Sequence, residues 1–388
     1  MNSYPTYKPS GIEWLGDIPE HWEVKRIKNV SLKVQTGTTP KTAISKYYEA
    51  EDINWFTPVD FSKDILLVNA KNKISQIAID EGAGRFFSKG SVLLLGIGAT
   101  IGKIGILSED SSANQQINSV TFSNKMNSLF AAYSMKIYET EIIKFANFST
   151  LPIFNQSNTS NLIIGIPPKQ EQTAIANYLA EKTSKLDQLI KNKKAQIAQL
   201  KEIRQIEINT AVTKGLDPNT KLKASGIEWL GDIPEHWEVK RIKNLSFLSG
   251  EKVFDYSDGD FLVALENITS WTGKLIKSDN SFEEGGIQFN SNSVLFGKLR
   301  PYLAKAYRPE KSGICVSEIL SINCESWLNR DFLFYRLLSD AFIDVINGST
   351  FGAKMPRANW LFISSLKMPL PSVQEQTAIA NYLDEKTS

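Results

Sequence analysis

Ser10–Asn29 reads SGIEWLGDIPEHWEVKRIKN, and the same twenty letters recur without a change at Ser225–Asn244. A second block also occurs twice: Gln170–Ser184 reads QEQTAIANYLAEKTS, and Gln374–Ser388 differs from it at one position only. The chain thus carries two nearly identical frames, each of which opens with the first block and closes with the second.

The residues enclosed by the frames, 30–169 and 245–373, show no convincing alignment with each other. Each insert has about the size of one domain. Unlike inserts in matching frames predict two different recognition surfaces in equivalent positions. We therefore expect a pseudo-two-fold internal repeat of α/β class (α+β type), with two strand-rich globular domains separated by a long helix that forms a coiled coil.

The composition places the chain among soluble globular proteins. Its 388 residues suffice for two or three domains, and 42% apolar with 22% charged residues is an ordinary balance. No stretch is apolar over the eighteen or so residues that a membrane span needs, and the start MNSYPTYKPS lacks the features of a secretion signal. Cys315 and Cys324 have no metal-ligand spacing, which favours reduced thiols in a cytoplasmic protein. With a net charge of only +2, any binding of nucleic acid must use local basic patches.

A stripe of apolar residues at helical spacing predicts one long helix over residues 170–214. Prolines at 167–168 precede it and Gly215 follows it, so its length would be roughly 65 Å. Lys193 and Gln196 interrupt the stripe, as polar residues do in a coiled-coil seam. A spacer between the frames is favoured over a core helix of one large domain. The stripe consists of Ile175, Leu179, Leu186, Leu189, Ile190, Ile197, Leu200 and Ile203.

The second frame begins the same helix at Gln374, but no counterpart of Lys185–Lys214 follows it. By the internal symmetry we expect a shortened second helix. Part of the central stripe would then be covered by another polypeptide or left exposed.

Both inserts are expected to be rich in strands. In the first, Ile53–Val59 favours a strand, and Ser91–Leu107 favours two short strands around a Gly-rich turn. The turn GIGATIG is no dinucleotide loop, since strand-like residues follow it instead of a helix. Its amides, with Thr100 and Lys103, could contact a DNA phosphate. The second insert favours strands at Phe261–Leu265, Ser293–Leu295 and Ile314–Val316, and helices at Phe332–Leu338 and Ala341–Ile346.

The sequence offers no credible active site. The two histidines, His21 and His236, hold the same frame position beside a tryptophan, which indicates packing. The sequence contains no HExxH, GxSxG or Walker motif, and IPPK at 166–169 is not the Asn-Pro-Pro-aromatic motif of adenine methyltransferases. The acidic residues around Asp52 lack a His or Cys partner, which favours a solvated loop.

Cations, amides and hydroxyls gather in both inserts as they do in DNA-binding proteins. Phe296–Arg308 (FGKLRPYLAKAYR) interleaves four cations with two tyrosines. Arginine can read guanine with two hydrogen bonds, amides suit adenine, and lysine pairs with phosphates. For any one residue a solvated loop is an equal alternative, but the sets favour DNA. The predicted DNA contacts are Thr38, Thr39, Lys41, Thr100, Lys103, Asn114, Gln115, Gln116, Asn155, Gln156, Lys298, Arg300, Tyr302, Lys305, Lys354, Arg357 and Asn359.

The repeated frame supplies aromatic anchors with two interpretations. They pack against the long helix, or they dock a partner protein, in which case two identical sites would bind two identical copies. The predicted docking residues are Trp14, Trp22, Trp229, Trp237, Leu179, Leu186 and Leu200.

Taken together, these motifs resemble the specificity subunit of a type I restriction–modification system. The similarity covers the whole chain. It rests on the repeated GIEWLGDIPEHWEVKRIKN, on IPPKQEQTAIANYL and MPLPSVQEQTAIANYL before the helices, and on TGTTPKT, YYEAEDINWFTPVDF, SVLLLGIGATIGKIGI, NQQINSV and FGKLRPYLAK within the inserts.

The resemblance implies a subunit without chemistry of its own, in which two target recognition domains each read half of a bipartite, asymmetric site on double-stranded DNA. The helices would act as a ruler for the gap and dock two modification subunits, which bind S-adenosylmethionine and methylate adenine at N6. Restriction subunits would use ATP and Mg²⁺ to translocate and cleave. The chain itself would bind no cofactor, metal or membrane. Its shortened second helix departs from the family and leaves association with a second copy open. The expected domains are 1–169 (first recognition domain), 170–215 (central helix), 216–373 (second recognition domain) and 374–388 (start of the C-terminal helix).

Two other classes of protein remain as alternatives. A self-contained DNA methyltransferase or nuclease would need a cofactor loop and a catalytic motif, and binding of S-adenosylmethionine by the isolated chain would reveal it. A coiled-coil adaptor would not need two large, different inserts, and sequence-selective DNA binding by the complex would exclude it.

Overall fold

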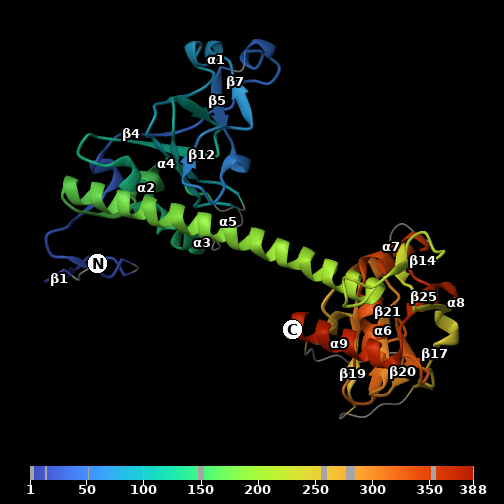
Figure 1. The fold of residues 1–388 in the computed structure, drawn as a ribbon. Helices are drawn as coiled ribbons and strands as arrows, with labels where there is room; N and C mark the ends of the chain where they lie inside the picture. Colours follow the sequence, from blue (N-terminus) through green and yellow to red (C-terminus); the bar gives the residue numbers. More distant parts are fainter. Residues whose placement is uncertain are drawn as a thin grey trace. The chain divides into compact units, whose positions relative to one another are not determined.

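The computed structural model describes residues 4–13, 15–50, 52–98, 100–146, 153–254, 260–276, 285–350 and 355–387. The chain forms two compact units, Met1–Ile190 and Lys191–Ser388 (Figure 1). The helix α5 (Lys169–Lys214) contributes its first part to one unit and the remainder to the other. This confirms the predicted long helix over 170–214.

The first unit is built on a five-stranded sheet with β9 (Val92–Leu95) at its centre. Alternate side chains of a strand point to opposite faces. Val92 and Leu94 therefore pack with the helix α2 (Ser128–Lys136), while Leu93 and Leu95 pack with a second sheet. The unbroken apolar run VLLL reflects this burial on both faces. The order of the sheet is β4 (Ser31–Thr36), β12 (Ile117–Phe122), β9, β10 (Ile104–Leu107) and β6 (Leu66–Leu67).

The two predicted strand regions of the first insert are present. Strands β9 and β10 pair antiparallel around the Gly-rich turn. The strand at Ile53 ends at Phe56, because the Thr57 backbone N–H donates to Asp60 Oδ2 (2.7 Å) and caps a short 3-10 helix. The second sheet has the order β7 (Asn72–Ile74), β5 (Ile53–Phe56), β11 (Ser111–Ala113) and β8 (Phe86–Phe87), and the remaining helices are α1 (Gln76–Asp80), α3 (Glu139–Ala146) and α4 (Gln156–Asn161).

The second unit repeats this plan with two four-stranded sheets. The predicted strands and helices of the second insert occur at their expected places, with shifts of a few residues at the ends. One sheet has the order β17 (Ser246–Leu248), β24 (Ile319–Cys324), β21 (Ser293–Gly297) and β22 (Ala306–Tyr307). The other has the order β18 (Lys252–Val253), β20 (Gly286–Phe289), β23 (Gly313–Cys315) and β19 (Leu262–Val263), and the helices are α6 (Arg330–Leu337), α7 (Asp340–Gly348) and α8 (Trp360–Ser365).

Each frame closes around its insert through a pair of strands. The end of the first block forms one strand, and the residues before the second block form its antiparallel partner. The pairs are β3 (Glu23–Arg26) with β13 (Ile163–Ile166) and β16 (Glu238–Arg241) with β25 (Lys367–Leu370), and hairpins precede them at β1 (Tyr7–Pro9) with β2 (Asp17–Pro19) and β14 (Leu222–Ala224) with β15 (Asp232–Pro234).

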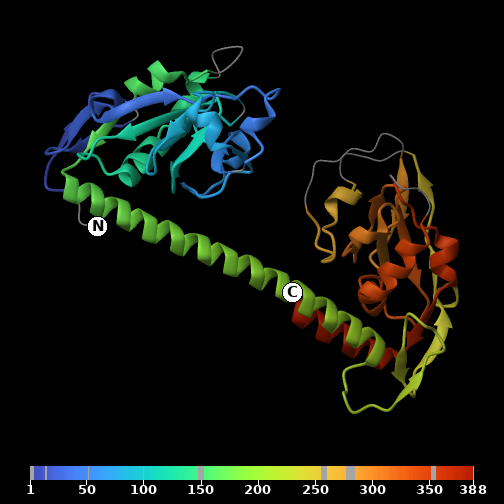
Figure 2. The same ribbon diagram turned by 90° about the horizontal axis from the view of Figure 1, so that it is seen from above.

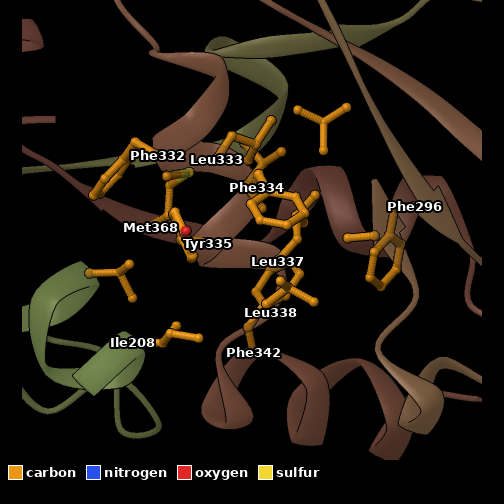
Figure 3. Packing of buried hydrophobic residues seen from close by; sticks show 14 of the residues in the cluster. Ile208, Phe296, Phe332, Leu333, Phe334, Tyr335, Leu337, Leu338, Phe342 and Met368 are labelled. Carbon is orange, nitrogen blue, oxygen red and sulfur yellow. The ribbon is translucent and has the colours of Figure 1, made fainter. Parts of the chain in front are cut away.

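The core of the second unit gathers around α6. Its residues Phe332–Leu337 are buried from one end to the other, together with Phe342 of α7 and Met368 of β25 (Figure 3). Ile208 near the end of α5 belongs to the same cluster. The last part of the long helix is therefore a core element of the second unit.

The helix α9 (Val373–Thr387) lies beside the last part of α5 within the second unit (Figure 2). The Tyr382 hydroxyl donates to Glu207 Oε2 (2.9 Å), while Gly215 lies close to the side chain of Glu375, so the two helices run antiparallel. Before this contact the α5 stripe is open, with Leu186 57% and Leu200 64% exposed.

The inserts share one fold although their sequences do not align. In both inserts, the strand that follows the second sheet in the sequence (β12 or β24) pairs with the central strand of the other sheet (β9 or β21). A helix, α2 or α6, comes next in the sequence. The helices α2 and α6 begin at Asn127 and Asn329, whose side chains cap them alike. The fold class predicted from the repeat is confirmed. Alignment fails because different apolar residues satisfy the same burial pattern, such as VLLL in β9 and VLFG at Val294–Gly297.

Candidate nucleic-acid interface

A glutamate near the start of α5 and its counterpart near the start of α9 each hold the repeated frame on the helix. Glu171 accepts hydrogen bonds from Trp22 Nε1 (3.0 Å) and at His21 Nε2 (2.8 Å), and also from the Tyr4 hydroxyl. In the second unit Glu375 bonds to Trp237 Nε1 (2.9 Å) and His236 Nε2 (3.1 Å). The histidines and tryptophans therefore position the frame, as their shared place in the repeat indicated.

The protonation behaviour of this cluster follows from its contacts. Burial alone would raise the pKa of Glu171, but the hydrogen bonds donated by Tyr4, His21 and Trp22 outweigh it and lower that pKa. The hydrogen bond to the carboxylate raises the pKa of Tyr4 to about 12. Glu171 is thus held as an anion beneath the aromatic residues of the frame.

The glutamine after each of these glutamates was not singled out from the sequence, although QEQT occurs in both blocks. Gln172 is buried; its Nε2 donates to the Pro167 carbonyl (2.9 Å), and its Oε1 accepts from the Asn127 backbone N–H (2.8 Å). Gln376 makes the same bonds to Pro371 and Asn329, at 2.9 and 2.7 Å. These amides fasten the insert to the helix, and their recurrence in both blocks was the available signal.

Backbone hydrogen bonds around the end of β9 bring most of the predicted contacts of the first insert together, but not Lys41, Thr100 and Lys103. The Gly96 N–H donates to the Gln116 carbonyl (2.8 Å), and the Phe154 N–H donates to the Gly96 carbonyl (2.7 Å). The Thr38 N–H donates to the Ala113 carbonyl (2.9 Å). We name this place the first edge, and it consists of Thr38, Thr39, Gly96–Gly98, Asn114–Gln116 and Ile153–Gln156.

The close packing of the first edge explains one of its glycines. A Cβ on Gly96 would lie 2.4 Å from the Phe154 carbonyl oxygen, so no larger residue fits. Asn118, which was not predicted, holds the same segment: its Nδ2 donates to the Phe154 carbonyl (2.8 Å) and to Thr159 Oγ1 (2.9 Å). Its place in the NQQINSV motif was the signal for it.

Some side chains of the first edge support the fold, and others are free to face a ligand. Asn114 is buried, and its amide bonds to Gln116 through both its oxygen and its nitrogen (3.0 and 3.1 Å). Asn155 caps α4 by accepting from the Asn158 N–H. Gln115 and Gln156 are exposed, and Gln115 accepts a hydrogen bond from Thr39.

The second unit builds the same edge with different residues. The Lys298 N–H donates to the Glu318 carbonyl (2.9 Å), and the Ala358 N–H donates to the Lys298 carbonyl (2.8 Å), as Gly96 does with its two partners. Bridges between Ile97 and Ile153 and between Leu299 and Arg357 correspond as well. The second edge consists of Lys298–Arg300, Tyr302, Glu318 and Pro356–Asn359.

The second edge presents cations in place of amides. Arg300 is exposed and has a left-handed backbone (φ 52°), at the position where Gly98 has φ 101°. Arg357 is paired with Glu318 at 3.1 Å, a carboxylate that the sequence did not single out. Tyr302 is 45% exposed, and Asn359 caps α8 by accepting from the Leu361 N–H (2.9 Å).

Two predicted phosphate contacts have internal partners. Lys103 Nζ donates to the Phe61 carbonyl (3.0 Å), and Lys305 Nζ donates to the Leu265 carbonyl (2.6 Å). Burial also lowers the pKa of Lys305. These lysines hold equivalent places in the two units and tie their sheets to a neighbouring loop. Lys41 and Thr100 are exposed, whereas Lys354 lies outside the described residues.

The predicted docking residues also differ in how far they are buried. Trp237 is buried (1% exposed), which favours packing over docking. Trp22, Trp229 and Leu179 are half-buried. Leu186 and Leu200 are exposed on α5, and Trp14 lies outside the described residues.

The part of the chain that the structure describes contains no candidate metal site and no candidate membrane span. No three His, Cys, Asp or Glu side chains among them are grouped so that they could hold a metal ion. None of the helices described is both long enough and apolar enough to cross a bilayer.

Comparison with known proteins places both units in one family. Residues 19–201 and 234–388 match the family model of the type I restriction modification DNA specificity domain. The chain is 26% identical to the type I restriction enzyme MjaVIII specificity subunit of Methanocaldococcus jannaschii, over 94% of this chain and 86% of that protein. It is 31% identical to the MjaIX specificity subunit of the same organism, over 60% of this chain and 53% of that protein.

Solved structures show the same fold. The HsdS subunit from Thermoanaerobacter tengcongensis matches with a TM-score of 0.58 and 14% identity, over 95% of this chain and 90% of that one. A chain from a type I R-M system studied for its assembly and conformational transition matches with a TM-score of 0.65 and 13% identity, over the same shares. Since the family model matches both inserts and most of the two frames, the chain belongs to the type I restriction modification DNA specificity family.

Proposed function

We propose that this chain is the sequence-recognition subunit of a type I restriction–modification complex and that each unit reads one half of a bipartite, asymmetric DNA site. One observation carries the proposal: the two edges have the same backbone construction but different side chains. A pseudo-symmetric scaffold with unlike reading residues suits a target whose halves differ in sequence.

The first edge supplies neutral readers. Gln115 and Gln156 are exposed, and Gln116 is half-buried beside them. An amide can give and accept a hydrogen bond at the edge of adenine. We assign base contacts to these three residues and to Thr39, whose hydroxyl orients Gln115. Asn114 and Asn155 support the edge, because their carbonyl oxygens are used within the chain.

The second edge supplies charged readers. Arg300 and Arg357 present guanidinium groups that can bind the O6 and N7 of guanine together. Arg357 would exchange its pairing with Glu318 for that contact, so Glu318 orients the free side chain. Lys298 and Tyr302 flank these groups and suit phosphates. Lys103 and Lys305 are assigned to the fold.

The chemistry belongs to partner subunits in this proposal. The relatives matched above are named specificity subunits. Methyl transfer to adenine and ATP-dependent cleavage would then reside in modification and restriction subunits, which the frames and α5 dock.

The decisive experiment maps N6-methyladenine by long-read sequencing of a plasmid, in cells that express this chain with its cognate modification subunit. A gapped, two-part methylated motif that vanishes without this chain is the expected result. A soluble complex that methylates no such motif would refute the proposal.

The gap between the half-sites tests the role of α5. Insertion of four residues near Lys193, about one helical turn, should lengthen the tolerated gap and leave both half-site sequences unchanged. The methylated motif of the insertion variant gives the answer directly. A changed half-site would remove α5 from the role of a spacer.

A further inference from the structure

A groove on the first unit lies between the repeated frame and the start of α5, and its volume is about 330 Å³. The buried part of its lining is apolar, with Met126 at 4% exposure and Val30 and Ile166 half-buried. The exposed part includes Lys125 and Lys169. The groove therefore suits a ligand that combines an apolar side chain with negative charge.

The lining of this groove has an excess of positive charge. Lys25, Lys125 and Lys169 contribute cations, and Glu23 is the one carboxylate among the described lining residues. Glu23 is already paired with Lys25. Lys125 and Lys169 make no ion pair with any residue that the structure describes. Two ammonium groups are thus available for the carboxylates of a ligand.

The second unit is built differently at the same place. The buried glutamine of each repeated block donates its Nε2 to the Lys125 carbonyl in the first unit (3.4 Å) and to the Trp327 carbonyl in the second (3.0 Å), so these two residues are counterparts. Lys169 and Val373 are counterparts too, because each begins its helix directly before the repeated block. Trp327 and Val373 are 50% and 45% exposed. A basic surface on one unit is thus replaced by an apolar surface on the other.

The groove lies at the far end of the sheet from the first edge. Strand β12 starts beside that edge, where the Gly37 N–H donates to the Ile117 carbonyl (2.8 Å), and it ends at Phe122. The next residue, Ser123, lines the groove, and its N–H donates to the Val30 carbonyl (3.1 Å). Five steps along a strand separate its ends by roughly 17 Å. DNA bound at the first edge would therefore leave the groove free for a protein.

We propose that this groove binds an acidic segment of a partner protein, with an apolar residue among its carboxylates. The carboxylates would pair with Lys125 and Lys169, and the apolar side chain would contact Met126. Since the second unit presents Trp327 and Val373 instead, the segment would occupy only one of the two units. The partner would thereby distinguish the two halves of a pseudo-symmetric chain. The choice of a protein over DNA rests on the reading role proposed for the first edge, whereas the binding of an acidic segment does not.

The probe is a fluorescein-labelled peptide of alternating glutamate and aspartate with one central leucine, titrated with the full chain without DNA. In fluorescence anisotropy it should bind at one site per chain, and more weakly as salt is added. Lys125→Glu with Lys169→Glu should weaken binding about tenfold, since two ion pairs are lost. Lys243→Glu with Lys367→Glu, at exposed lysines of the second unit, changes the net charge equally and should leave binding unchanged.

A second double variant tests the groove with side chains that the repeated frame already accommodates. Lys125→Trp with Lys169→Val gives the first unit the residues of the second, so the fold should persist while the peptide no longer binds. A peptide with serine in place of leucine should bind more weakly, because the apolar contact is lost. Unchanged affinity of the original peptide for this double variant would contradict the assigned site.

Crosslinking locates the bound peptide. A carbodiimide joins a carboxylate directly to a lysine amine, and the expected products link the peptide to Lys125 and Lys169. Products confined to lysines of the second unit would overturn the proposal, as would absence of binding at millimolar peptide. If Lys125→Glu with Lys169→Glu weakened binding of random duplex DNA by the assembled complex while the peptide failed to bind, the groove would be a phosphate contact and the proposal would be wrong.

Discussion

The two copies of the helix start differ at one residue, and the inserts explain why. In the second unit Asp384 accepts hydrogen bonds from Arg308 Nη2 (2.6 Å) and the Tyr335 hydroxyl (2.6 Å). In the first unit the residues at these places are Ala180 and the buried Ile106. The frame therefore changes only where an insert supplies a charge that needs a partner.

A second exchange follows the same logic inside the inserts. Asn118 and Thr159 form a buried hydrogen bond in the first unit, and the equivalent residues of the second unit, Leu320 and Ile363, belong to one apolar cluster. A polar pair is replaced by an apolar pair, so at these two positions neither unit leaves a single buried polar side chain facing an apolar one. The repeated frame thus tolerates different interiors as long as each is complementary within itself.

The largest expected effect is the loss of stability when a frame tryptophan is replaced, and it should differ between the two units. Trp237→Ala should destabilise the second unit by roughly 3–5 kcal/mol, the usual loss for a large buried aromatic residue. Trp22→Ala should cost the first unit less, because Trp22 is only half-buried and lines an apolar pocket. Hydrogen exchange of the amides in α6 and α2 measures each unit separately. Equal losses would contradict an effect of the different burial of the two tryptophans.

The next effect concerns the unlike edges. Arg300→Ala should weaken discrimination at one half-site by about 1–3 kcal/mol, and Gln115→Ala should act on the other half-site. Binding of the assembled complex to DNA with single changes in either half-site measures both. If Arg300→Ala weakened specific and random DNA equally, the arginine would be a phosphate contact.

The pair of Arg308 and Asp384 should contribute less, because Asp384 is partly exposed and solvent screens the interaction. Asp384→Ala should destabilise the second unit by about 1–2 kcal/mol. Adding Arg308→Ile, which recreates the pair of the first unit, should recover part of the loss. A double-mutant cycle from urea unfolding measures the coupling. As a control, Ala180→Asp should bring no gain, since Ile106 offers it no cation.

The smallest effect is the response of the first unit to acid. A carboxylate whose pKa is lowered by folding stabilises the fold fully above its unfolded pKa of about 4.3, and that contribution is lost as the pH falls through the folded pKa. Glu171→Gln should remove this part of the acid sensitivity, which is on the order of 1 kcal/mol. Tyr4→Phe should remove a fraction of it. Unfolding curves of both variants between neutral pH and pH 3 provide the measurement; an unchanged slope would exclude the cluster as its source.

The sequence alone determined the architecture of this protein. The exact repeat predicted two equivalent units, and the apolar stripe without Gly or Pro predicted the helix over 170–214. Both patterns can be seen in the sequence without knowing which distant residues are in contact. Clusters of amides and cations also pointed to the two edges, because such residues are costly to bury and gather where a polar ligand binds.

The tertiary structure decided which of these residues are available. Lys103, Lys305, Asn155 and Asn359 have the right chemistry for DNA. The ammonium groups of the two lysines are nevertheless bonded to backbone carbonyls, and the side-chain oxygens of the two asparagines cap helices. The likeness of the two inserts also became visible only in space, since burial constrains volume and polarity but not residue identity. Trp237 is buried while Trp22 at the same place in the repeat is half-buried, because the burial of a frame residue depends on which elements pack beside it. That is a property of long-range contacts that no local pattern carries.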